Sequence, residues 1–288
     1  MKNFTFNIKA FISSFLIIVL AFITAGNAER GIKDPVDANE VRIMSFNIRY
    51  SEFVKRIGAV PKQIGEYMPD SVGLQECTYD WYNTLQILLP EYEIVALGRD
   101  TGDISKDCGE MSAILYRSDK YKLVDSGHFW ISETPEKVSN GWDGACNRIC
   151  TWVILENLET GKQYAHVNCH LDHEGNVART EGAKLVAQKA LSFDIPTVLT
   201  GDFNFSKGCD EYNTVIALGL KDTQDIATET MSGKTYHAYN GGTSGQPIDY
   251  VFVNNKITSV SKYQIIRDKI NFSYVSDHYP VYADMVIG

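Results

Sequence analysis

The chain has 288 residues, of which 44% are hydrophobic and 22% are charged, and its formal net charge is −9 at neutral pH. This length and apolar content suffice for one large folded domain or two small ones. The acidic charge excludes a general electrostatic attraction to nucleic acid, which comes mainly from basic side chains that neutralise phosphates, although a local basic patch stays compatible with it.

The first 28 residues are typical of a secretory signal peptide. Two lysines give a positive start, residues 10–25 are almost wholly apolar, and small residues precede a cleavage site expected after Ala28. The apolar run is shorter than a comfortable membrane span, and an uncleaved N-terminal anchor is the alternative. We therefore expect an exported protein, periplasmic or secreted, in which residues 29–288 form one domain. Loss of two lysines and no acid changes the formal charge from −9 to −11.

Short apolar runs recur along the chain, and most are bounded by Gly, Pro, Asp or Asn, which is typical of strands. The expected strands are residues 41–48, 71–75, 111–116, 149–155, 164–170, 197–200, 250–253 and 281–286. Helical spacing or helix-forming composition predicts three helices between some of them, at residues 57–67, 177–191 and 211–218. Strands interspersed with helices favour a layered α/β domain over a helical bundle or a simple all-β sandwich.

Two long segments without a periodic pattern, residues 98–109 and 132–145, are predicted to be surface loops. Loops of this length often carry substrate recognition. The six cysteines match no zinc pattern of paired C-x-x-C motifs, and we expect no essential disulfide.

Polar side chains stand where four of the apolar runs end: Asn47, Glu76, the pair Asp202 and Asn204, and the pair Asp277 and His278. Each alone has an ordinary explanation, such as a turn former, a helix cap or a solvated charge. Together, carboxylates at the ends of separate strands can converge on one edge of a sheet, where a hard cation such as Mg²⁺ finds oxygen ligands. The histidines are then free for proton transfer or phosphate contacts, because no zinc motif competes for them.

Six short blocks occur in order between residue 41 and the C-terminus: Met44-Ser45-Phe46-Asn47, Leu74-Gln75-Glu76, His170-Leu171-Asp172-His173, Gly201-Asp202-Phe203-Asn204, Ile248-Asp249-Tyr250 and Ser276-Asp277-His278. Together they resemble the endonuclease/exonuclease/phosphatase superfamily, in particular its exported bacterial members. The resemblance implies an α/β fold, a four-layer α/β/β/α sandwich with two mixed, mainly antiparallel sheets packed face to face. It also implies dependence on Mg²⁺ or Mn²⁺.

The resemblance implies roles for the residues at the strand ends. Asn47, Glu76 and Asp277 would lie at the metal, with Glu76 as its main ligand. Asp202 would orient or deprotonate the attacking water, and Asn204 would hold a phosphate oxygen.

Further catalytic roles follow from the same resemblance. Asp249 would fix the tautomer of His278, which would contact the phosphate or act as a base. His170 would contact the phosphate or act as an acid towards the leaving group. Tyr116 fits a tyrosine that some members use near the phosphate, and an ordinary strand aromatic is its alternative interpretation. Arg148 is proposed from its position alone and not from the resemblance. It begins a strand after the second loop, where its guanidinium group could donate two hydrogen bonds to a phosphate, and a structural ion pair is the alternative.

The sequence therefore predicts an exported Mg²⁺- or Mn²⁺-dependent phosphoesterase that hydrolyses a phosphodiester or phosphomonoester by metal-assisted in-line attack of water. The substrate would be a small molecule, a lipid head group or a nucleic acid, and we expect a monomer without a stable protein partner. A secreted nuclease acting on DNA or RNA is one alternative, and an inactive binding module on the same fold is another. Arg49 stands where DNA-repair members carry an acidic residue, and the inositol-phosphatase signature is missing around Asp249.

Overall fold

The computed structural model describes residues 32–34 and 36–288, so the expected signal peptide lies outside the described residues. The division of the chain into this peptide and one domain over residues 29–288 stays a prediction. In the described part of the chain, no helix combines the length and the apolar character that crossing a membrane requires.

The first of two large sheets has seven strands in the order β10-β12-β15-β1-β2-β4-β3. Its strands are β1 (Val41–Asn47), β2 (Ser71–Gln75), β3 (Tyr92–Val95), β4 (Ile114–Arg117), β10 (Glu229–Thr230), β12 (Ser259–Ile265) and β15 (Val281–Val286). The neighbours β1 and β2 at its centre are parallel, and each has an antiparallel partner on its other side. The last residues of β1 and β2 therefore lie at the same edge of this sheet.

The second sheet has six strands in the order β5-β6-β7-β8-β11-β9 and repeats this arrangement. Its strands are β5 (Tyr121–Trp130), β6 (Ile149–Asn157), β7 (Gln163–His170), β8 (Thr197–Asp202), β9 (Lys221–Asp222) and β11 (Asp249–Val253). Its central pair, β7 and β8, is parallel, and the other strand pairs are antiparallel. A short hairpin of β13 (Lys269–Ile270) and β14 (Ser273–Tyr274) stands apart from both sheets.

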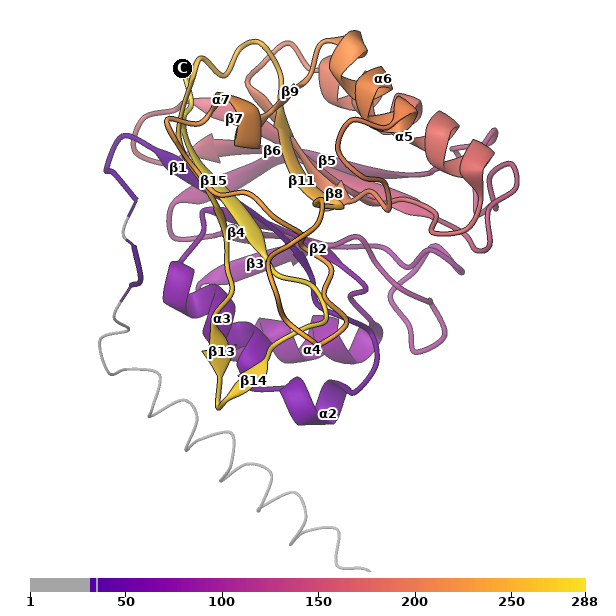
Figure 1. Cartoon of the computed structure of the whole chain (residues 1–288), viewed down its shortest axis with the longest axis horizontal. Coiled ribbons are helices and arrows are strands. Elements are labelled where there is room, and N and C mark those ends of the chain that lie inside the picture. Colours follow the sequence, from indigo (N-terminus) through magenta and orange to yellow (C-terminus); the bar gives the residue numbers. More distant parts are fainter. Residues whose placement is uncertain (1–31, 35) are drawn as a thin grey trace, which may run out of the picture.

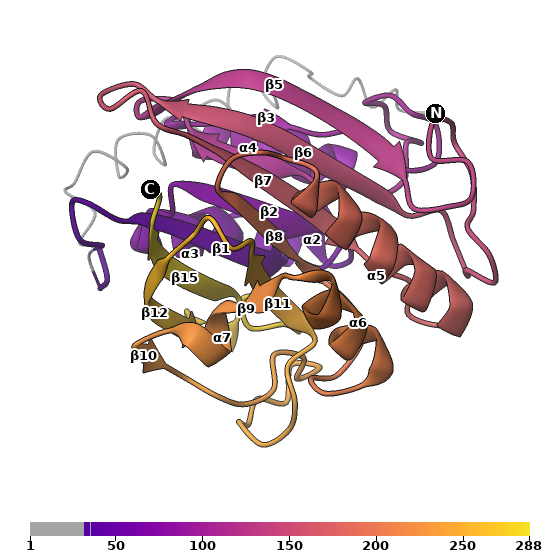
Figure 2. The same cartoon turned by 90° about the horizontal axis from the view of Figure 1, so that it is seen from above.

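Helices cover the outer faces of the two sheets (Figures 1 and 2). Those on the first sheet include α3 (Ala59–Tyr67) and α4 (Tyr79–Leu88), and those on the second include α5 (Asn176–Leu191) and α6 (Asp210–Leu218). Two single-turn helices, α2 (Phe53–Arg56) and α7 (Thr223–Ile226), complete the set in the described residues. The predicted four-layer sandwich with two mixed sheets is confirmed.

Three apolar clusters hold the four layers together, and the two-residue period of the strands determines which side chain joins which cluster. In β1, Ile43 faces the second sheet, whereas Phe46 packs in the cluster that contains Trp81 of α4. In β8, Val198 lies between the sheets, and Leu199 packs in the cluster that contains residues of α5.

All eight expected strands are present, and the three expected helices correspond to α3, α5 and α6. The expected strand at residues 111–116 begins later, at Ile114, because Met111 makes only an isolated bridge with Cys77. The strands β3, β5 and β12 and the helix α4 were not predicted. Most of β5 is exposed or half-buried, so it shows little of the alternation by which strands are recognised.

A seam of buried polar side chains, which we call the inter-sheet polar seam, joins the inner faces of the sheets: Ser71, Gln75, His166, Asn168 and Thr200. The two ring nitrogens of His166 lie 2.8 Å from Ser71 Oγ and 2.8 Å from Thr200 Oγ1. Asn168 Oδ1 accepts from Gln75 Nε2 at 2.8 Å and from Thr200 Oγ1 at 3.0 Å. All five residues are fully buried, and buried polar groups are stable only when they have partners. The seam therefore favours one placement of the sheets.

Gly73 of β2 faces the seam and leaves no room for a side chain. A Cβ atom there would lie under 3.0 Å from Thr200 Oγ1 and from Asn168 Oδ1. We expect Gly73→Ala to reduce the free energy of unfolding by about 1–3 kcal/mol or more, because the seam would have to shift. Urea unfolding followed by circular dichroism measures this loss.

Gly58→Ala is the matched control, because a Cβ atom at Gly58 meets nothing within 4 Å. It should change the free energy of unfolding by less than about 1 kcal/mol. Equal losses in the two variants would mean that the seam tolerates displacement.

Candidate active site

The ends of four strands from both sheets meet at one edge of the sandwich. Asn47 ends β1, Glu76 follows β2, His170 ends β7 and Asp202 ends β8. Asn47 Nδ2 donates to Glu76 Oε1 at 3.1 Å and to Asp202 Oδ2 at 2.9 Å. This amide therefore links the carboxylate beside β2 in the first sheet to the carboxylate of β8 in the second.

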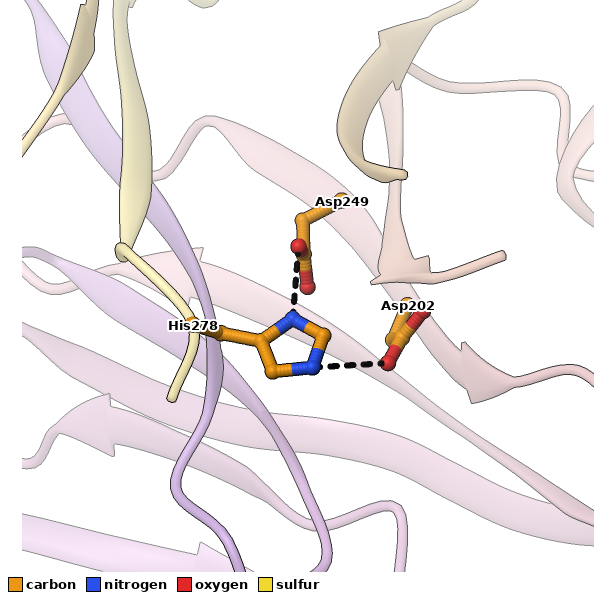
Figure 3. Close-up of side chains that lie close together, drawn as sticks. All are labelled: Asp202, Asp249 and His278. Atoms are coloured by element: carbon orange, nitrogen blue, oxygen red, sulfur yellow. Dashed lines mark hydrogen bonds and ion pairs between the residues drawn. The ribbon is translucent and has the colours of Figure 1, made fainter. Parts of the chain in front are cut away.

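His278 lies between two buried carboxylates at this edge (Figure 3). Its Nδ1 is 2.9 Å from Asp249 Oδ2, and its Nε2 is 3.7 Å from Asp202 Oδ2. Burial alone would lower the pKa of His278, but the charges of Asp249 and Asp202 raise it to about 10. Burial and the nearby Asp249 raise the pKa of Asp202 to about 7. The imidazole therefore carries a proton at neutral pH, which neutralises part of the surrounding negative charge.

His170 has the opposite character. Its side chain is almost fully buried, and burial together with the charges of Arg148 and Arg99 holds its pKa well below the usual range. Its Nε2 lies 3.5 Å from Asp202 Oδ2. The ring is therefore neutral, which suits it to a hydrogen bond with a phosphate rather than to donation of a proton.

Glu76 is the carboxylate best suited to a divalent cation. Its Oε1 accepts from Asn47, and its Oε2 accepts from the backbone N–H of Tyr50 at 2.8 Å. Among the described residues, no basic side chain lies within 4.0 Å of its carboxylate oxygens to form an ion pair. Burial and, after it, the negative charge of Asp249 raise the pKa of Asp202, so a positive charge at this edge would stabilise its carboxylate. Oxygen donors with excess negative charge are what Mg²⁺ and Mn²⁺ bind, so the residues present fit such an ion.

Asp202, Asp249 and His278 also offer three ligand-type atoms within 4.8 Å of one another, a spacing that a metal ion could use. A protonated imidazole has no lone pair for a metal, however, and His278 Nδ1 is already engaged by Asp249. We interpret this group as a charge triad, and a cation beside Glu76 stays a prediction. Asp277 is less available than Glu76, because its Oδ2 pairs with Arg49 Nη1 at 2.6 Å.

A cleft of about 300 Å³ opens over these groups. The residues predicted from the sequence that line it are Glu76, Arg148, His170, Asp202, Asn204, Asp277 and His278. Asn47 and Asp249 lie directly behind the lining, hydrogen-bonded to Asp202 and His278 respectively. The structure thus brings nine of the ten predicted site residues together, while the individual roles of these residues stay predictions.

Tyr116 is the predicted site residue that the structure places elsewhere. The antiparallel register of β4 sets Tyr116 opposite Ser71 at the start of β2, whereas Glu76 follows the end of that strand. Its buried hydroxyl donates to Glu93 of β3. The expected contact with the phosphate is therefore not found, because the direction of β4 carries this side chain away from the site.

Arg148 makes the structural ion pair considered for it and also faces the cleft, where a phosphate could bind. Its Nε lies 3.4 Å from Asp172 Oδ2, its Nη2 lies 2.9 Å from His173 Nδ1, and it also lines the cleft. Asp172 is itself held by the backbone N–H groups of residues 145, 174 and 175. The ion pair therefore positions the guanidinium at the cleft.

Sequence reasoning missed several lining residues that come from loops. Arg99 lies in the loop predicted at residues 98–109, and its Nη1 donates to Glu110 Oε2 at 2.9 Å. Glu110 Oε2 is in turn 3.9 Å from His170 Nδ1. The long loop does reach the cleft through Arg99, but nothing in its sequence distinguishes the residues that face the cleft.

Two of the site residues have left-handed backbones although neither is glycine. Glu76 has a φ of 59° and Asn204 a φ of 52°, and each lies just beyond or near the end of a central strand. Such conformations cost about 1–3 kcal/mol and cluster at functional sites. The Asn204 backbone N–H donates to Asp202 Oδ1 at 3.1 Å, so this turn also orients the buried carboxylate.

Comparison with known proteins identifies similar chains. A sequence model of the Endonuclease/Exonuclease/phosphatase family matches residues 44–278. A protein of that family from Bacteroides vulgatus is 33% identical, with a TM-score of 0.80 over 86% of this chain and 99% of its own. A mannosyl-6-phosphatase from Bacteroides thetaiotaomicron is 30% identical, with a TM-score of 0.78 over 86% and 100%.

More distant structures share the fold. Danio rerio TDP2, solved with a single-stranded DNA product, is 19% identical, with a TM-score of 0.68 over 86% of this chain and 99% of its own. A search of curated proteins gives no match.

The charge triad predicts a pH-dependent stability for the metal-free protein. The folded-state pKa of His278, about 10, lies above its unfolded value of about 6.5. The extra proton stabilises the fold fully below the lower value, and this contribution is lost as the pH rises through the higher one. We expect the free energy of unfolding to fall from about pH 7 to about pH 10, with a limiting slope of about 1.4 kcal/mol per pH unit.

Urea unfolding in EDTA measures this slope. Asp249→Asn, which removes the main neighbouring charge, should flatten it, whereas Asp107→Asn at an exposed carboxylate should not. Identical slopes in all three proteins would contradict a protonated His278.

Proposed function

The chain belongs to the endonuclease/exonuclease/phosphatase family, and we propose that it is a Mg²⁺- or Mn²⁺-dependent phosphatase that hydrolyses phosphomonoesters of small molecules. In this proposal the protein is exported, with residues 1–28 removed, and acts as a monomer.

The shape of the cleft is the observation that favours a monoester. A second, smaller space of about 10 Å³, about the volume for one water molecule, adjoins the cleft and is lined by residues that include Arg99, Glu110, Arg148 and His170. A phosphodiester needs room for an organic group on two sides of the phosphorus. A terminal phosphate would direct its free oxygens towards this small space, beside the guanidinium groups of Arg99 and Arg148.

The mannosyl-6-phosphatase from Bacteroides thetaiotaomicron supports the same choice, because that protein, as named, removes a phosphate from a sugar. It is similar to this chain over its entire length. Similarity at this level supports the reaction class but does not carry the identity of the sugar.

In this proposal Asp202 accepts the proton of the attacking water. It is buried beside Asn47, and its pKa of about 7 makes it a stronger base than an ordinary aspartate. The water oxygen forms the new bond to phosphorus while the bond from phosphorus to the alcohol oxygen breaks. Of the two hydrogens of the water, one ends on the alcohol and the other on inorganic phosphate.

The two histidines bind the phosphate in this proposal. His278 donates through its protonated Nε2, and neutral His170 donates a single N–H. Protonation favours a phosphate contact for His278 over the role of a base, and neutrality argues against His170 as an acid. Asn204, which also lines the cleft, would hold a phosphate oxygen through its amide.

Glu76 would hold the cation, with Asn47 behind it and Asp277 close by. A bound Mg²⁺ or Mn²⁺ would polarise a phosphoryl oxygen and neutralise charge that develops in the transition state. The alternatives carry less support. The acidic chain disfavours a nuclease, and nearly all proposed catalytic groups are in place, which disfavours an inactive binding module.

Hydrolysis assays test the proposed activity. We expect turnover of p-nitrophenyl phosphate and hexose 6-phosphates with Mg²⁺ or Mn²⁺, little turnover of bis(p-nitrophenyl) phosphate, and none in EDTA. His278→Ala should lower kcat by about 10²–10⁴-fold, because it removes a positioned donor from the transition state. Glu159→Gln, at an exposed carboxylate away from the cleft, should have no effect. Preference for the diester, or activity that survives EDTA, would refute the proposal.

Thermal unfolding tests the metal site independently of activity. Mn²⁺ at about a hundred times its dissociation constant should stabilise the protein by about 2.7 kcal/mol and raise its melting temperature. Glu76→Gln should abolish most of this increase, and Glu159→Gln should retain it. An equal increase in the Glu76→Gln variant would place the cation elsewhere.

A further inference from the structure

An exposed aromatic side chain lies beside the proposed catalytic histidine. Tyr236 lines the cleft although 46% of its surface is accessible to solvent, and its ring centroid lies 5.0 Å from that of His278, at an interplanar angle of 54°. It belongs to residues 231–248, the long connection between β10 and β11 (Figure 2).

Backbone hydrogen bonds join this connection to residues 277–279, the segment that contains Asp277 and His278. The backbone N–H of His237 donates to Asp277 O at 2.8 Å, and that of Tyr279 donates to Thr235 O at 2.8 Å. Tyr236 and His278 thereby form an isolated antiparallel bridge. The ring of His237 stacks on Tyr279 with the centroids 3.9 Å apart. Tyr236 is therefore held in place before any ligand arrives.

The backbone that follows Tyr236 is strained. Ala238 has a φ of 48° and Tyr239 a φ of 62°, two consecutive left-handed residues that are not glycine. Each costs about 1–3 kcal/mol, and such strain persists where the surrounding structure imposes it. Here the contact that holds the backbone is with Asp277. Its carbonyl oxygen accepts hydrogen bonds from the N–H groups of both His237 and Ala238.

The cleft next to the phosphate site offers two kinds of surface. Tyr236 and the half-buried Ile248 provide apolar area, and Arg148 and His173 provide donors. A sugar ring presents a face of C–H groups and an edge of hydroxyl groups, and it matches a cleft that combines an aromatic face with a few polar groups.

We propose that Tyr236 forms the subsite for the leaving alcohol and that this subsite takes the C–H face of a sugar ring. The inference rests on the proposed phosphatase function and adds the chemical class of the alcohol. The sugar ring packs on the side chain of Tyr236, and the phosphate on the exocyclic oxygen of the sugar lies between Glu76 and His278. Water attacks phosphorus, the bond between phosphorus and the sugar oxygen breaks, and the free sugar and inorganic phosphate leave.

Steady-state kinetics on cyclic and acyclic substrates tests the subsite. For Tyr236→Ala we expect kcat/KM on hexose 6-phosphates to fall about threefold to tenfold, mainly through KM, because the stacking contact is lost from both ground and transition states. The value for glycerol 3-phosphate, which has no ring, should change less than about twofold. Tyr236→Phe should retain wild-type values, because the ring face and not the hydroxyl makes the contact.

Phe272→Ala is the control for loss of an exposed aromatic ring, since Phe272 is 96% exposed and does not line the cleft. It should leave both substrates unaffected. Equal losses on hexose 6-phosphates and glycerol 3-phosphate in Tyr236→Ala would mean that Tyr236 positions His278, and unchanged kinetics would mean that it makes no contact. Either result overturns this inference alone. Absence of phosphomonoester turnover by the wild-type protein would overturn the proposed function and the subsite together.

Discussion

Asn168 of β7 reaches across the sandwich and donates to the backbone carbonyls of Leu74 in β2 and of Ala113 just before β4, at 2.8 and 3.0 Å. With the other members of the inter-sheet polar seam it sets how one sheet lies on the other. Side chains alternate between the two faces of a strand, so residues two positions apart point to the same face. His170 therefore shares the face of Asn168, and Asp202 shares the face of Thr200. A slip of one residue would turn these groups into the outer layers, so the active site depends on the register that the seam maintains.

The site also concentrates negative charge that the fold alone does not neutralise. Asp202 and Asp249 are buried, Glu76 has only neutral hydrogen-bond partners, and His278 supplies a single positive charge between two carboxylates. Burial of carboxylates beside too little positive charge costs free energy, so a cation bound at this edge would favour folding. In the proposed reaction this imbalance would favour binding of a divalent ion, and the raised pKa of Asp202 would let that carboxylate take up a proton near neutral pH.

Much of this arrangement was predictable from the sequence, because its determinants are local. Short apolar runs bounded by Gly, Pro, Asp or Asn predict the central strands, and polar residues at their ends predict that Asn47, Glu76 and Asp202 converge. Features that depend on tertiary register were not predictable in the same way. Tyr116 has the sequence context of a site residue, but the direction of β4 removes it, and Arg99 and Tyr236 enter the cleft from loops whose paths follow no period. The Tyr236 connection is fixed by contacts with Asp277, which no local pattern reveals.

The position of the cation decides most directly whether this account is correct. Diffraction from crystals soaked in Mn²⁺, recorded at the manganese absorption edge, locates the ion by its anomalous signal. The account predicts a peak at the carboxylate of Glu76, with His278 free of the ion and still hydrogen-bonded to Asp249. A peak enclosed by Asp202, Asp249 and His278, with none at Glu76, would contradict both the protonated histidine and the proposed division of roles between the carboxylates.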